Sequence, residues 1–116
     1  MTDTRPALEV RRASPTIAII AVRGELTGAM DAALMDAYAR AADPATRAVA
    51  LDCTELEYMN STGIGLLVTL LVRAQRQRQR LMAFGLSDHY RQILSLTRLD
   101  EAIGIVGSEE EALAAG

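Results

Sequence analysis

A short polar segment in the middle of the chain holds the side chains best suited to chemistry. It reads Met-Asn-Ser-Thr-Gly over residues 59–63 and leads straight into the longest apolar stretch of the sequence. Ser61 and Thr62 carry hydroxyl groups that could act as nucleophiles, accept a phosphoryl group or cap a helix. Which of these uses is open depends on the other side chains that the sequence supplies.

The sequence offers little support for a catalytic hydroxyl. A hydrolase nucleophile elbow reads Gly-x-Ser-x-Gly, but Met59 stands at the position of the first glycine. The chain contains no lysine, and His89 is its only histidine, so His89 alone could serve as the base of an enzyme built on Ser61. One histidine and one cysteine, Cys53, cannot form a zinc cluster or a disulfide. We therefore predict a protein that is not an enzyme and that needs no metal or cofactor.

Length and composition exclude several classes of protein. The chain has 116 residues and a formal net charge of −3, and its aromatic residues are three tyrosines and one phenylalanine. The charge argues against a nucleic-acid or membrane-surface binder, and so few rings cannot form a base-stacking platform. Residues 63–72 are far short of the roughly 20 apolar residues of a membrane span, and residues 1–6 lack the apolar core of a signal peptide. We expect a cytoplasmic protein with one domain, residues 1–116, and an ordered core over about 8–113.

Strand-like and helix-like segments alternate along the chain. Five segments read as strands, the first of them an edge strand: residues 8–11, 16–23, 48–52, 81–84 and 102–106. Four segments read as helices: residues 30–42, 62–79, 88–99 with Ser87 as N-cap, and a last one that begins at 108–111. This order predicts an α/β fold with a mixed, mostly parallel five-stranded sheet, an antiparallel edge strand and about four packed helices.

The start of the second helix is the predicted site, because function in open α/β sheets gathers at the carboxyl ends of strands. Ser61 falls at or near the N-cap of this helix, followed by Gly63 and Gly65 in its first turn. Each glycine costs a helix about 1 kcal/mol relative to alanine, so some interaction should offset that cost. The close approach of another backbone or a ligand is one candidate. Ser61 is then either a simple helix cap or a regulated serine at an interface.

The periodicity of this helix suggests where a partner would bind. Four residues form one apolar stripe that we predict to face the sheet: Ile64, Leu67, Val68 and Leu71. Leu66 and Leu70 fall on the opposite side, near Ser61. We predict that they are exposed and belong to a partner surface, with packing against a neighbouring helix as the alternative.

Residues 52–67 resemble the signature of STAS domains, particularly of bacterial anti-sigma factor antagonists. In that family a strand ends in Asp, and a loop leads into an Asp-Ser-Ser/Thr-Gly-Leu-Gly turn at the start of a helix. Here the turn reads Asn-Ser-Thr-Gly-Ile-Gly over residues 60–65, and the element order agrees over residues 8–113. The departure that matters in this turn is Asn60 in place of the family's Asp.

The resemblance implies a phosphorylation switch at Ser61, with Thr62 as the fallback acceptor. The partner would be an anti-sigma factor with serine kinase activity, bound while Ser61 is unphosphorylated, and a phosphatase acting on phospho-Ser61 is a further implied partner. We expect a monomer or weak homodimer. The predicted partner-binding residues are Glu25, Thr27, Asp52, Asn60, Ser61, Thr62, Gly63, Gly65, Leu66 and Leu70. The alternative is a non-switching STAS scaffold subunit of a stressosome-like or lipid-transport complex.

Several other residues have simpler interpretations. Asp52, at the end of a strand, is well placed to cap the following loop. The four arginines among residues 73–80 resemble an RNA-binding run, but cations at a helix C-terminus complement the helix dipole, and we favour that role. We predict that His89 lies on a helix surface and that Cys53 is a small buried apolar side chain.

Overall fold

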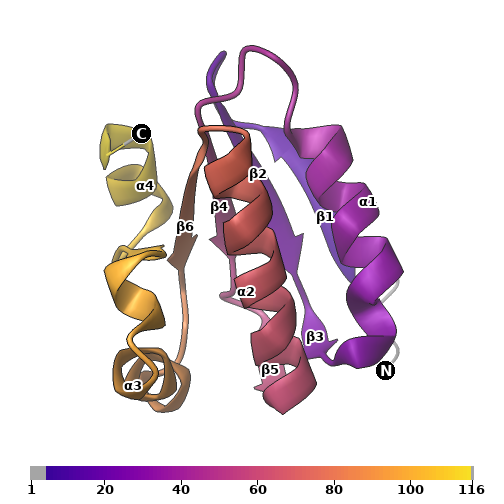
Figure 1. The fold of residues 1–116 in the computed structure, drawn as a ribbon, viewed down its shortest axis with the longest axis vertical. Helices are drawn as coiled ribbons and strands as arrows, with labels where there is room; N and C mark the ends of the chain where they lie inside the picture. Colours follow the sequence, from indigo (N-terminus) through magenta and orange to yellow (C-terminus); the bar gives the residue numbers. More distant parts are fainter. Residues whose placement is uncertain (1–4, 116) are drawn as a thin grey trace.

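A five-stranded mixed sheet forms the centre of the molecule. The computed structural model describes residues 5–115, and its main sheet has the strand order β1-β2-β4-β6-β7 (Figure 1). β1 (Leu8–Arg12) pairs antiparallel with β2 (Ile17–Val22), whereas β4 (Ala48–Asp52), β6 (Arg80–Phe84) and β7 (Gly104–Ile105) join in parallel. The predicted α/β class, with its antiparallel edge pair, is confirmed.

Four helices cover the two faces of this sheet unequally. The three longer helices, α1 (Asp31–Ala41), α2 (Ser61–Arg76) and α3 (Asp88–Leu96), contribute to the larger apolar core on one face. The short helix α4 (Glu109–Ala115) covers the other face of the sheet. There, Ala112 shares a second apolar cluster with alternate residues of β2, β4 and β6. Strands buried on both faces explain why their sequences are apolar without alternation.

A second, small sheet lies beside the start of α2 and was not predicted. It consists of β3 (Gly24–Leu26) and β5 (Leu56–Met59), paired in parallel. Gly24 has a φ of +76°, a conformation that favours glycine, and it separates β3 from the main-sheet strand β2. No strand is predicted between residues 52 and 62, because the four residues of β5 carry no clear alternation.

The ends of several elements differ from prediction. The second helix was expected to reach residue 79 but ends at Arg76, and Arg78 has a left-handed φ of 56° just beyond it. The last strand was expected over 102–106 but has only two residues, because the 3₁₀ helix η2 (Leu99–Glu101) and a turn occupy the chain before it. A further 3₁₀ helix, η1 (Gly28–Met30), precedes α1.

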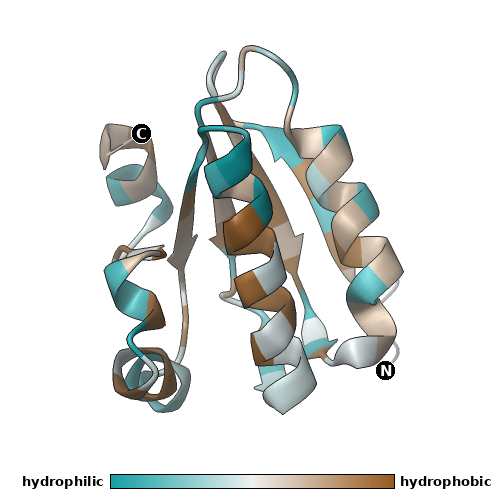
Figure 2. Cartoon of the chain, in the orientation of Figure 1, coloured by the Kyte–Doolittle hydropathy of each residue, from teal (hydrophilic) through white to brown (hydrophobic). Residues whose placement is uncertain are grey.

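Apolar residues run along most of α2, and polar residues gather at its C-terminal turn (Figure 2). This helix is 16 residues long, and no helix among residues 5–115 combines the length and apolarity of a membrane span. The prediction of one domain over 1–116 includes residues 1–4 and 116, which lie outside the described residues.

Candidate partner-binding site at the start of α2

Asn60, and not Ser61, caps α2. The Asn60 Oδ1 atom accepts a hydrogen bond from the Gly63 N–H at 2.8 Å and another from the Thr62 hydroxyl at 2.7 Å. Ser61 is the first residue of the helix and does not cap it. The placement of Ser61 at or near the N-cap was therefore right to within one residue, but the interpretation of Ser61 as the capping side chain is wrong.

The two hydroxyl groups of this turn have different surroundings. The Thr62 hydroxyl donates to Asn60 and accepts a hydrogen bond from the Gly28 N–H at 3.0 Å, so it ties η1 to α2. Ser61 is exposed, and its hydroxyl makes no hydrogen bond within the described part of the chain. Of the two candidate phosphate acceptors, Ser61 has the accessible and uncommitted oxygen.

Gly63 has the close backbone contact that the sequence suggested. It is buried, and a Cβ atom added there would lie 2.1 Å from the carbonyl oxygen of Leu26 in β3. Gly65 is different, because it is exposed and an added Cβ would meet nothing within 4 Å. The close backbone contact is thus confirmed for Gly63, whereas at Gly65 no other described segment approaches and the backbone of α2 is bare toward solvent.

Glu25 and Thr27 lie next to this turn. Glu25 pairs with Tyr58 in the small sheet and is exposed, while the Thr27 Oγ1 atom accepts from the Ala29 N–H at 3.3 Å and so caps η1. Thr27 directly precedes Gly28, the residue bonded to Thr62. The structure therefore brings these two predicted site residues together with the start of α2.

Asp52 lies at the far end of β5 from Ser61. Its Oδ1 atom accepts hydrogen bonds from the Thr54 N–H at 3.0 Å and the Thr54 hydroxyl at 2.7 Å. The loop-capping role is confirmed. The four residues of β5 span about 13 Å at 3.3 Å per residue, so Asp52 is not part of the cluster around Ser61.

Leu66 and Leu70 do not form an exposed surface. Leu66 is 7% exposed and Leu70 is fully buried, so the prediction that they face a partner is wrong. The exposed apolar side chains of α2 are instead Val68, at 39%, and Val72, at 41%. The prediction that Val68 faces the sheet is therefore also wrong, because the helix is rotated about its axis relative to the predicted orientation.

The backbone contact of Gly63 explains the observed phase of the helix. A helix that is apolar on several sides offers no unique inward stripe, but a glycine pressed against another backbone must face inward. Starting from Gly63, the inward positions at three- and four-residue spacing are Leu66, Leu67, Leu70 and Ala74, all of which are buried. Gly63 and Ala74 are small, but Gly65 is equally small and lies on the exposed side, so residue size in the sequence could not have set the phase.

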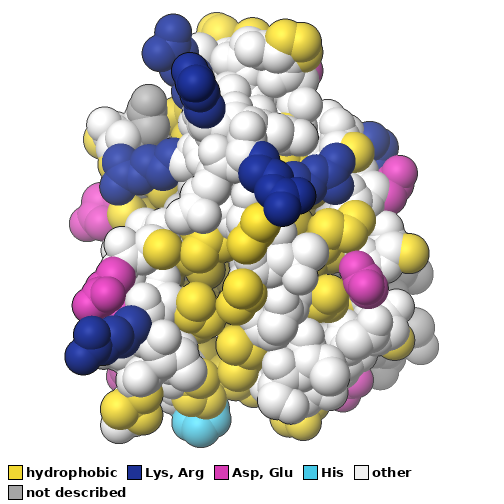
Figure 3. All heavy atoms as spheres, viewed as in Figure 1, with side chains coloured by type: hydrophobic (Ala, Val, Ile, Leu, Met, Phe, Trp, Pro, Cys, Tyr) yellow, Lys and Arg dark blue, Asp and Glu magenta, His cyan; other side chains and the backbone are white. Residues whose placement is uncertain are grey.

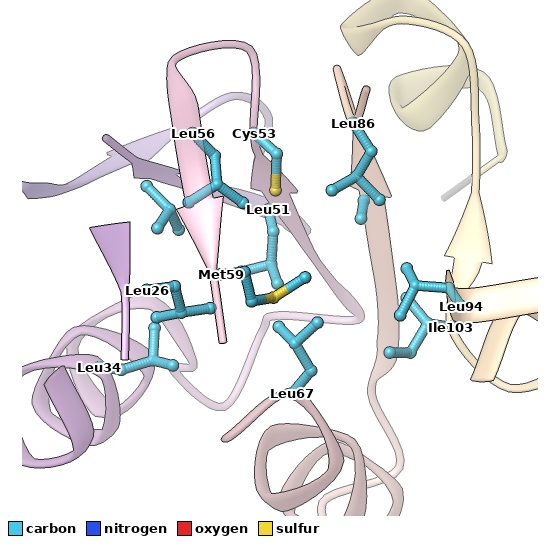
Figure 4. A pocket seen from close by; sticks show the side chains of 12 residues that line it. Leu26, Leu34, Leu51, Cys53, Leu56, Met59, Leu67, Leu86, Leu94 and Ile103 are labelled. Atoms are coloured by element: carbon cyan, nitrogen blue, oxygen red, sulfur yellow. The ribbon is translucent and has the colours of Figure 1, made fainter. Parts of the chain in front are cut away.

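The polypeptide behind the site is firmly anchored. The Met59 N–H, next to the cap residue, donates a hydrogen bond to the Tyr90 hydroxyl of α3 at 2.8 Å. Twelve apolar side chains enclose a cavity of about 10 Å³ between β5, α2 and the main sheet, including Met59, Leu67 and Cys53 (Figure 4). This space is about the size of a single water and has no polar lining, so we assign it no ligand.

Cys53 is buried, as predicted. Burial among apolar side chains, and secondarily the negative charge of Asp52, raise the pKa of its thiol to about 12. His89 is exposed on α3, which confirms its predicted surface position. Among the described residues, no group of three or more His, Cys, Asp or Glu side chains could hold a metal ion.

The fold is that of a STAS-type domain, and the comparisons agree. The family described as "Mlab, STAS domain" matches residues 10–107, so the chain belongs to the STAS domain family. The anti-sigma-B factor antagonist of Listeria monocytogenes is 36% identical over 61 residues, or 53% of this chain and 54% of that protein. The match therefore spans about half the length of this curated relative.

Solved structures show the same fold. A putative anti-sigma factor antagonist from Thermotoga maritima has a TM-score of 0.79 and 17% identity, covering 93% of this chain and 92% of that one. Bacillus SpoIIAA in its phosphorylated form has a TM-score of 0.68 and 19% identity, covering 94% and 98%. The chain is a STAS domain related to anti-sigma factor antagonists, a family of non-enzymatic regulators, which confirms the resemblance seen in the sequence.

Proposed function

We propose that this protein is an anti-sigma factor antagonist that binds an anti-sigma factor with serine kinase activity, and that phosphorylation of Ser61 switches the binding off. One observation carries the proposal. Ser61 presents an exposed, unbonded hydroxyl at the first turn of α2, whereas Asn60 and Thr62 on either side are engaged in the cap. The relatives named as anti-sigma factor antagonists support the class of partner, and SpoIIAA is a structural relative that exists in a phosphorylated form.

The first turn of α2 can hold a phosphate without unfolding. The backbone N–H groups at the start of a helix lack partners inside the helix, and the helix dipole favours an anion there. The Asn60 side chain uses its oxygen for the cap, and its Nδ2 amide makes no hydrogen bond to a described residue. Asn60 therefore adds an uncharged donor beside Ser61, where the aspartate usual in the family would add a repelling charge.

The same phosphate would oppose binding of a partner at this turn. A phosphoserine carries about −1.5 to −2 charges at neutral pH. An interface closed over such a group must strip its water, and an unpaired buried anion costs several kcal/mol. The phosphate thus changes recognition while leaving the folded state intact, as a reversible switch requires.

The test uses the serine-kinase anti-sigma factors of the source organism, purified and titrated one by one against the protein. We expect one of them to bind the parent and Ser61→Ala, and to phosphorylate the parent but not Ser61→Ala. Ser61→Glu should bind at least tenfold more weakly, with an unchanged melting temperature. Mass spectrometry of the phosphorylated parent should place the phosphate on Ser61.

Two results would count against the switch. Equal binding by Ser61→Glu and the parent would favour the non-switching scaffold subunit. A phosphate located on Thr62 would show that the cap opens, since the Thr62 hydroxyl is engaged at both ends in the present structure.

A further inference from the structure

One face of α2 is exposed along its whole length. Ser61, Gly65, Val68, Val72 and Arg76 recur at spacings of three and four residues, and all five are exposed. Arg76 lies fifteen positions after Ser61, so this exposed strip is about 22 Å long at a rise of 1.5 Å per residue. The strip begins at the proposed switch and ends at the last helical residue.

The distal half of the strip borders a shallow apolar hollow with a basic edge. Its lining comes from Val68, Thr69, Val72, Arg73, Arg76 and Gln77, a set with two arginines and no acidic residue. Figure 3 shows apolar side chains on this face with arginines gathered above them. The hollow therefore combines two valines with two arginines, and the arginines lie toward the C-terminal end of α2.

Arg73 and Arg76 differ in their contacts. Arg73 is half-buried, donates a hydrogen bond to the Met35 carbonyl at 3.2 Å and lies 5.2 Å from the centre of the Tyr38 ring, so it helps hold α1 against α2. Arg76 is exposed and makes no ion pair with any described residue. Arg76 is the cation on this edge that is free to meet an acidic group from outside.

We propose that this strip is the docking surface for an acidic amphipathic helix of the partner protein, a proposal that rests on the proposed function and deepens it. Apolar side chains of the partner helix would cover Val68 and Val72, and its carboxylates would meet Arg76. The bare backbone at Gly65 would let that helix approach closely. Because the protein as a whole has a net charge of −3, attraction to an acidic partner must come from a local basic edge such as this one.

This arrangement also places the two ends of the partner helix along the strip. Its carboxylates lie at the Arg76 end, and the other end of the helix reaches the first turn of α2, beside Ser61. A phosphate on Ser61 would then clash with the end of the docked helix. The apolar and basic contacts further along the strip would not be touched by the phosphate. The strip would supply affinity, and Ser61 would supply control.

The experiment compares strip variants with matched controls in titrations against the serine-kinase anti-sigma factor that binds the parent. Val72→Glu places a charge in the apolar hollow, and Leu96→Glu is its control, because Leu96 is 76% exposed on α3. Arg76→Gln removes the free cation, and Arg91→Gln does the same at an exposed site on α3. Melting curves establish that each variant is folded.

We expect Val72→Glu to weaken binding at least tenfold and Leu96→Glu to leave it unchanged. Arg76→Gln should weaken binding severalfold at about 0.1 M salt, and the difference from the parent should shrink at about 0.5 M, where surface charges are screened. Arg91→Gln should match the parent at both salt concentrations.

Failure of this proposal and failure of the switch give different results. If Ser61→Glu loses binding while Val72→Glu and Arg76→Gln bind like the parent, the strip is wrong and the switch stands. If Val72→Glu loses binding while Ser61→Glu does not, the strip stands and the switch is wrong. Tighter binding by Arg76→Gln would overturn the acidic partner. A parent dimer that Val72→Glu converts to monomer in sedimentation would show that a second copy occupies the strip, and would also overturn the proposal.

Discussion

Gly63 of α2 rests directly on the carbonyl group of Leu26 in β3: a Cβ atom on Gly63 would lie 2.1 Å from the carbonyl oxygen and 2.8 Å from the carbonyl carbon. Only a residue without a side chain fits such a contact. The contact also sets the rotation of α2 about its axis, because the face that carries Gly63 must point inward. Leu66 and Leu70 are therefore buried, and Val68 and Val72 are left outside.

Gly63→Ala should destabilise the domain, although alanine is the better helix former. The added methyl group overlaps backbone atoms of Leu26 that cannot move without shifting β3, and overpacking of this kind typically costs about 1–3 kcal/mol. Gly65→Ala is the matched control, because its Cβ points into open space and should stabilise α2 by up to about 1 kcal/mol. Urea denaturation measures both free energies of unfolding. Equal effects of the two substitutions would contradict the close contact.

Asn60→Ala and Ser61→Ala should separate the cap from the candidate switch. Asn60→Ala removes the acceptor of the Gly63 N–H and should cost about 1 kcal/mol of stability. Ser61→Ala removes an exposed hydroxyl with no described partner and should change stability by less than about 0.5 kcal/mol. Thermal melting of the two variants checks this order. A larger loss from Ser61→Ala would mean that the serine is the cap after all.

Tyr90→Phe should weaken the anchor behind the site. The Tyr90 hydroxyl accepts the hydrogen bond of the buried Met59 N–H, and phenylalanine would leave that donor without a partner at a cost of about 1–3 kcal/mol. Tyr58→Phe is the control, because Tyr58 is exposed on the neighbouring β5 position. Amide hydrogen exchange should show faster exchange at Met59 in Tyr90→Phe alone. Unchanged protection at Met59 would mean that the bond does not hold β5.

Cys53 should be inert in the folded protein and should make stability fall at alkaline pH. Its thiol pKa rises in the folded state from an ordinary value of 9.0 to about 12, so the folded protein keeps a proton that the unfolded chain loses. The stabilising contribution is complete below pH 9 and is lost as the pH rises toward 12. Iodoacetamide at pH 8 should label Cys53 only after unfolding, and Cys53→Ala should flatten the loss of stability above pH 9. Rapid labelling of the native protein would contradict the burial.

Much of the architecture was present in local sequence. The apolar segments around residues 17–22 and 48–52 predict buried parallel strands, because strands covered on both faces need no alternation. Ser87 was identified as an N-cap from its type and place, and its side chain does accept the Tyr90 N–H at 3.4 Å. The position of the site followed from the same logic, because the loop after a parallel strand leads into α2.

Two features of the site depended on contacts between distant segments. β3 and β5 are three and four residues long and become strands only by pairing with each other across about 30 residues of chain, so neither had a pattern of its own. The sequence also could not show that Asn60 caps α2 and that Ser61 is its first helical residue, since both residue types are good helix caps. It was decided by the exact residue at which α2 begins against η1 and β3.

Local sequence is enough to predict that α2 is an apolar helix starting at Ser61 or beside it, because turn residues and helical periodicity are local properties. Only the tertiary structure shows which side of that helix packs against the core and which side is exposed. Leucines and valines occur on several sides of α2, so periodicity permits more than one inward face. The contact of Gly63 with Leu26 selects one of them, and that choice buries Leu66 and Leu70 and exposes Val68 and Val72.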